Sequence, residues 1–104
     1  MIIVTTDTIP GRTIVSTLGL VQGQSVRARH VGVSILAGLR YLIGGEIEGY
    51  SRLLAGARGE AVQRMTQAAE AQGANAVVGV RFSTASIMQG AAEILAYGTA
   101  VVVA

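Results

Sequence analysis

Apolar residues recur every three or four positions between Glu46 and Gln72, and this spacing predicts one long helix. Glu46 and Glu48 fall in its first turn, where negative charge compensates the helix dipole. Gly73 follows at the place of a left-handed residue that ends a helix. The middle of the apolar stripe is small, so we expect the helix axis to approach a sheet closely. The stripe consists of Ile47, Tyr50, Leu54, Ala57, Ala61, Met65 and Ala68.

Two strands are predicted before this helix. Residues 2–4 and 13–26 are rich in β-branched and other sheet-forming side chains. The dipeptide Pro10–Gly11 between them suits a tight turn, because proline fixes its own φ and glycine accepts a positive one. Gly19 and Gly23 interrupt the second strand and indicate bulges or close approaches of another backbone.

Two further strands are predicted after the helix, over residues 76–82 and about 92–103, with a loop or an irregular hairpin end at 83–91 between them. The last strand is apolar on both faces, so we expect the helix on one side and a neighbouring subunit on the other. Period-two alternation turns Arg81 away from the helix. The residues predicted to face the helix are Ala76, Val78, Val80 and Phe82.

The pairing of these two strands predicts a structural ion pair. If the hairpin is symmetric about Ile87, Arg81 faces Glu93 across the strands, and opposite charges at such positions attract.

A short helix is predicted over Val31–Leu42, where Ile35, Leu36, Leu39 and Leu42 stand three or four residues apart. The elements together predict an α+β fold of two layers, in the order β-β-α-α-β-β. An antiparallel sheet of about four main strands packs on one long and one short helix. A length of 104 residues suits a single domain, residues 1–104.

The composition of the chain indicates that the predicted fold does not exist as a single subunit. Apolar residues make up 51% of the chain and charged residues 13%, against about 25% charged in typical soluble domains. A monomer of this mass exposes roughly 5,500 Å², which so few charged side chains cover poorly. We therefore expect a homo-oligomer.

The charge pattern argues against several other partners. The eight arginines are spread from Arg12 to Arg81, without the clustering and aromatics of a nucleic-acid surface. Arg27, Arg29 and His30 form the one local basic cluster, which we interpret as a solvated strand end. No glycine motif for phosphate, membrane-spanning segment or signal peptide is recognised, so a cytoplasmic location without membrane attachment is expected.

Chemically reactive groups are sparse. The chain has no cysteine and one histidine, so neither a catalytic residue nor a cofactor is predicted. Metal ligation is not assigned, and its weak candidates are His30, Glu46 and Met88. Each has an ordinary alternative: a capping histidine, an acid at a helix start and a loop methionine. Met65 lies on the helix stripe and is predicted to be a core residue.

Four segments resemble the YbjQ family, whose members are labelled putative heavy-metal-binding proteins. They are GLVQG at 19–23, GGEIEGY at 44–50, RMTQAAEAQGANAVVGVRF at 64–82 and AEILAYGTAV at 92–101. The resemblance implies a dodecin-like subunit assembled into a cyclic homopentamer.

The predicted function is therefore that of a non-enzymatic, ring-forming homo-oligomer, which could hold a small ligand or ion at its interfaces. One alternative is metal binding, as the family label implies. Another is an enzyme with an inter-subunit active site, in which Thr5, Thr6 and Asp7 meet Tyr50, Arg81 or Glu93 of neighbouring chains.

Overall fold

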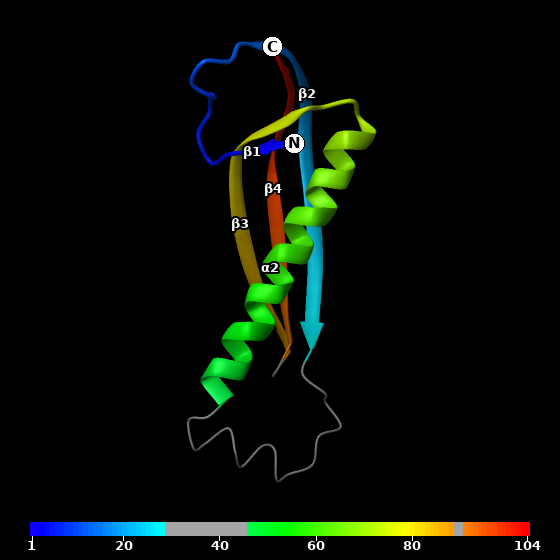
Figure 1. Ribbon diagram of the computed structural model, residues 1–104. Coiled ribbons are helices and arrows are strands. Elements are labelled where there is room, and N and C mark those ends of the chain that lie inside the picture. Colours follow the sequence, from blue (N-terminus) through cyan, green and yellow to red (C-terminus); the bar gives the residue numbers. More distant parts are fainter. Residues whose placement is uncertain (29–45, 89–90) are drawn as a thin grey trace.

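The computed structural model describes residues 1–28, 46–88 and 91–104. The predicted short helix Val31–Leu42 and the candidate ligand His30 lie outside these residues. Within them the chain forms four strands and one helix (Figure 1). In chain order these are β1 (Ile2–Ile3), β2 (Ile14–Ala28), α2 (Glu46–Ala71), β3 (Ala76–Met88) and β4 (Ala91–Val103).

The four strands form one mixed sheet in the order β1-β3-β4-β2. β2 and β3 each pair antiparallel with β4, but β1 runs parallel to β3, so the prediction of an antiparallel sheet is wrong at that edge. The predicted turn is confirmed: Gly11 has a φ of 77°, and the Arg12 N–H donates to the Ile9 carbonyl at 3.1 Å. The turn nevertheless joins strands at opposite edges, because the N-terminal segment continues alongside β3. There the Val4 N–H donates to the Val77 carbonyl at 3.0 Å.

α2 lies diagonally across one face of the sheet and packs mainly on β2 and β4 (Figure 1). Its small residues meet the sheet as predicted, and the contact is closest at Gly23. A Cβ atom at Gly23 would lie 2.2 Å from the Ala61 carbonyl oxygen, so only glycine fits there. Among the side chains of the helix that the structure describes, four are 0% exposed: Ala57, Ala61, Met65 and Ala69.

The end of α2 follows the predicted pattern. Gly73 has a φ of 87°, and its N–H donates to the Glu70 carbonyl at 2.9 Å. The Ala74 N–H donates to the Ala69 carbonyl at 3.1 Å. These two bonds and the left-handed glycine form a Schellman motif, which satisfies the last carbonyls of the helix and reverses the chain into β3.

β3 differs from the prediction in the direction of its first side chains. Val77 and Val80 pack in the core under α2, whereas Ala76 and Val78 belong to a second apolar cluster, on the other face. The cause is a bulge at Gly79, where φ is 62° and the pairing with β4 shifts. The predicted alternation is therefore wrong before the bulge. Beyond it, Phe82 pairs with the core residue Ala96, so Arg81 points away from α2 as predicted.

The N-terminal segment covers one end of the face opposite α2. Its apolar residues pack on a cluster formed by Ala76, Val78, Val101 and Val103. The covering residues are Ile2, Val4, Ile9 and Ile14. The predicted cover on the second face of β4 is thus supplied at this end by the chain itself.

Candidate functional site

The rest of the sheet face opposite α2 has no cover among the residues that the structure describes. We call this surface the open face. Two of its apolar side chains are well exposed, Leu20 at 69% and Val26 at 55%. Leu95 and Tyr97 on β4, the strand between β3 and β2, are half-buried. The strand registers assign to the open face Leu20, Gln22, Gln24 and Val26 of β2, Arg81, Ser83 and Ala85 of β3, and Glu93, Leu95, Tyr97 and Thr99 of β4.

One row of polar side chains crosses the open face from edge to edge. Tyr97 on β4 is paired with Arg81 on β3 and with Gln22 on β2. A guanidinium, a phenol and a primary amide therefore follow one another across the three strands. These groups form hydrogen bonds and favour an anionic or polar partner, and none is a ligand of soft metals.

The guanidinium of Arg81 is fixed by main-chain groups. Its Nη1 donates to the Thr5 carbonyl and to the Val80 carbonyl, at 2.8 Å each. Nε and Nη2 have no partner among the described residues, although together they form a fork that matches a carboxylate or phosphate. Thr5 belongs to the same chain, so this contact with Arg81 needs no neighbouring subunit.

The predicted ion pair between Arg81 and Glu93 is wrong in the single chain. Arg81 is paired with Tyr97 on β4. Glu93 lies four residues from Tyr97 along the same strand, where it is paired with Ala85 and Val26. Four residues of strand span about 13 Å. The register differs because β3 continues as a strand to Met88, through the segment predicted as a loop. Glu93 is half-buried and has no ion-pair or hydrogen-bond partner among the described residues.

A second charged cluster joins α2 to β2 on the opposite face. Glu60 accepts Nη2 of Arg27 on Oε2 at 2.6 Å and Nη2 of Arg64 on Oε1 at 2.7 Å. Arg64 also donates through Nη1 to the Gln24 carbonyl at 2.5 Å. Arg27 is therefore part of this cluster and not of the predicted solvated strand end. Because one carboxylate is shared by two guanidinium groups, the cluster is structural and offers no free acid.

The sequence contains no signal for the Arg27 contact. Glu60 and Arg64 are four apart on one helix, a spacing that can be recognised, whereas Arg27 comes from a strand 33 residues earlier. The same holds for Asn75, whose side-chain amide donates to the Val103 carbonyl and accepts the Val103 N–H, both at 2.8 Å. These contacts depend on the tertiary arrangement alone.

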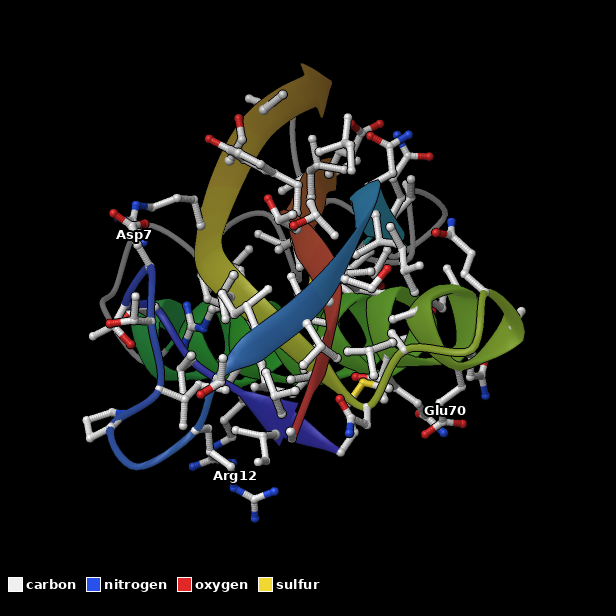
Figure 2. All side chains as sticks on the ribbon, turned by 90° about the horizontal axis from the view of Figure 1, so that it is seen from above. Asp7, Arg12 and Glu70 are labelled. Carbon is white, nitrogen blue, oxygen red and sulfur yellow. The ribbon has the colours of Figure 1, made fainter. Side chains whose placement is uncertain are left out.

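The candidate metal ligands do not come together in the described part of the chain. Glu46 begins α2 and Met88 ends β3, not a loop, and their side chains are outside the described residues, as is His30. Met65 is 0% exposed in the core, as predicted. Residues 1–28, 46–88 and 91–104 contain no group of three potential His, Cys, Asp or Glu ligands. Figure 2 shows Asp7, Arg12 and Glu70 at separate places on the periphery.

No helix within the described ranges is both long and apolar enough to cross a membrane.

Comparison with known proteins gives consistent matches over the whole length. A family model described as "Putative heavy-metal-binding" matches residues 1–104. The chain is 58% identical over 102 residues to a UPF0145 protein of Hahella chejuensis, covering 98% of each chain. It is 55% identical over 101 residues to a UPF0145 protein of Methanosarcina acetivorans, covering 97% of this chain and 95% of the relative.

A solved structure supports the fold. It is a protein of unknown function of the DUF74 family from Pediococcus pentosaceus, with a TM-score of 0.60 at 18% identity. The alignment covers 100% of this chain and 98% of that one.

Proposed function

This chain belongs to the YbjQ family, and we propose that it acts as a non-catalytic protein that assembles with copies of itself into a ring. In this proposal the open face lies in the contacts between subunits, where a small ligand or ion can be held beside the polar row of Arg81, Tyr97 and Gln22. The proposal names no chemical reaction.

The exposure of large apolar side chains on the open face carries this proposal. Leu20 and Val26 are 69% and 55% exposed on one strand, and Leu95 lies between them and β3. Fully burying one such side chain contributes about 1.5–3 kcal/mol. Large apolar side chains that are exposed on one face among polar groups are typical of a protein interaction site. A second copy that covers this face would therefore stabilise the assembly.

Light scattering coupled to size-exclusion chromatography tests the proposal. At micromolar concentration we expect a mass that is a multiple of the 10.7 kDa subunit. Leu20→Asp should weaken the assembly because it places a charge in the apolar contact. Gln63→Asp, on the exposed side of α2, should leave the mass unchanged. A wild-type protein of 10.7 kDa would contradict the proposal.

Heavy-metal binding is the second candidate, because the matching family carries that description. Soft metals prefer thiolate, thioether and imidazole ligands, and the described residues do not provide such a set. Apart from the buried Met65, the chain's thioether and imidazole donors are Met1, His30 and Met88. Native mass spectrometry after incubation with Cu(I) or Zn(II) separates the two candidates. Stoichiometric metal that is lost in His30→Ala or Met88→Leu would favour metal binding.

A further inference from the structure

Two unpaired groups of opposite charge share the open face. Arg81 presents the free fork of Nε and Nη2, because Nη1 is occupied by the Thr5 and Val80 carbonyls. Glu93 is half-buried between its strand neighbours Val26 and Ala85, which offer no charge or hydrogen bond to its carboxylate. A partly buried carboxylate without a partner costs free energy, and a guanidinium fork is the group that best satisfies it.

The single chain cannot bring these two groups together. They stand on different rows, separated by four residues or about 13 Å along β4. The contacts of Nη1 also hold the guanidinium toward the N-terminal segment, beyond the outer side of β3 and away from β4. Leu95 lies between the two rows and keeps them apart.

We propose that Glu93 of one subunit accepts the free fork of Arg81 from a second copy of the chain. This inference rests on the proposed assembly and specifies one of its contacts. The two groups occupy separate places on one face, so a subunit can offer Arg81 to one neighbour and Glu93 to another. Such a head-to-tail contact closes into a ring when the rotation between subunits allows it.

The energetic role of the pair follows from its surroundings. Leu20, Val26 and Leu95 supply apolar area that is not specific for one orientation. The pair adds a bidentate, charge-assisted contact that fixes which rows face each other, because any other placement leaves the half-buried carboxylate of Glu93 unpaired beside Val26 and Ala85. The apolar residues thus drive the association and the charges determine its register.

Charge exchange tests the contact directly. Arg81→Glu places two acids at the interface and Glu93→Arg places two cations there, so each should weaken assembly at least tenfold. The double variant Arg81→Glu with Glu93→Arg restores opposite charges and should return to wild-type mass at the same concentration. Arg58→Glu and Glu70→Arg make the same charge changes on the exposed side of α2 and should leave the mass unchanged.

Light scattering and circular dichroism together decide between the outcomes. Folded single variants with the wild-type mass would overturn the Arg81–Glu93 contact and leave the proposed assembly intact. A folded double variant that stays dissociated would also overturn it, as would equal losses in the two control variants. If Arg81→Glu does not fold because Thr5 loses its anchor, Glu93→Arg decides alone, since Glu93 has no such contact. A monomeric wild-type protein would remove both the contact and the assembly on which it rests.

Discussion

Gly23→Ala is the most direct probe of how α2 rests on the sheet. Gly23 is buried in β2 opposite Ala96, under the middle of the helix. The added Cβ would lie 2.2 Å from the Ala61 oxygen and 2.3 Å from the Met65 nitrogen. Both are backbone atoms of α2, so no side-chain rotation relieves the clash. The helix must move away from β2 or the strand must bend.

The size of the effect follows from this distance. Ordinary contact begins at 3.4 Å, so the helix must retreat by about 1.2 Å. A gap of 0.5–1 Å already forfeits about a quarter to a half of the dispersion energy of a contact. Overpacking of a core lowers stability by roughly 1–3 kcal/mol. Alanine also restricts the unfolded chain more than glycine does, which offsets about 0.4–1 kcal/mol of this loss. Because the obstruction is main chain, we expect a net loss of about 2 kcal/mol.

Urea unfolding followed by circular dichroism measures this loss, with all proteins at one concentration. For an m-value of about 1–3 kcal/mol/M, the midpoint should fall by roughly 1 M. Gly56→Ala is the matched control, because Gly56 is exposed in α2 and an added Cβ meets nothing within 4 Å. There alanine should stabilise the helix by about 0.5–1 kcal/mol.

Alanine should thus lower the unfolding midpoint at Gly23 and raise it at Gly56. A Gly23→Ala midpoint equal to or above that of the wild type would refute the reasoning. Such a result would mean that α2 does not lie against β2 at this position.

Two further substitutions test neighbouring parts of the structure. Ala61→Leu enlarges a side chain that is 0% exposed at the same contact. It should lower the free energy of unfolding in urea by about 1–3 kcal/mol. An unchanged midpoint would show that this side of the helix does not face the sheet. Asn75→Ala removes both hydrogen bonds to the main chain of Val103 and should cost about 1–2 kcal/mol. It should also accelerate hydrogen exchange of the Val103 amide, and exchange at the wild-type rate would contradict this role of Asn75.

Local signals predicted the elements whose geometry is decided by a few adjacent residues. The turn at Pro10–Gly11 and the end of α2 at Gly73 depend on backbone conformations that these residues adopt readily, and both are confirmed. The need for a small residue at Gly23 was also visible, because a glycine inside an apolar strand indicates a close approach.

The remaining features depend on contacts between distant segments. Gly79 could have been an ordinary strand residue, and only its φ of 62° and the shifted pairing with β4 reveal the bulge that reverses the preceding side chains. The hairpin register could not be predicted, because the polar residues after Phe82 are compatible with either a loop or a strand. The candidate site was consequently incomplete. Arg81 and Glu93 were identified, but Tyr97 and Gln22 join the polar row only through the observed pairing.

The position of β2 at the edge of the sheet has a consequence for the newly made subunit. Among the described residues no strand pairs with its outer side, which extends over Ile14–Ala28. Unsatisfied amide and carbonyl groups along such a length are a template on which any extended polypeptide can add, including fibre-forming ones. Association that also covers this edge would therefore protect the newly made chain from aggregation, and variants that delay it should accumulate as insoluble protein.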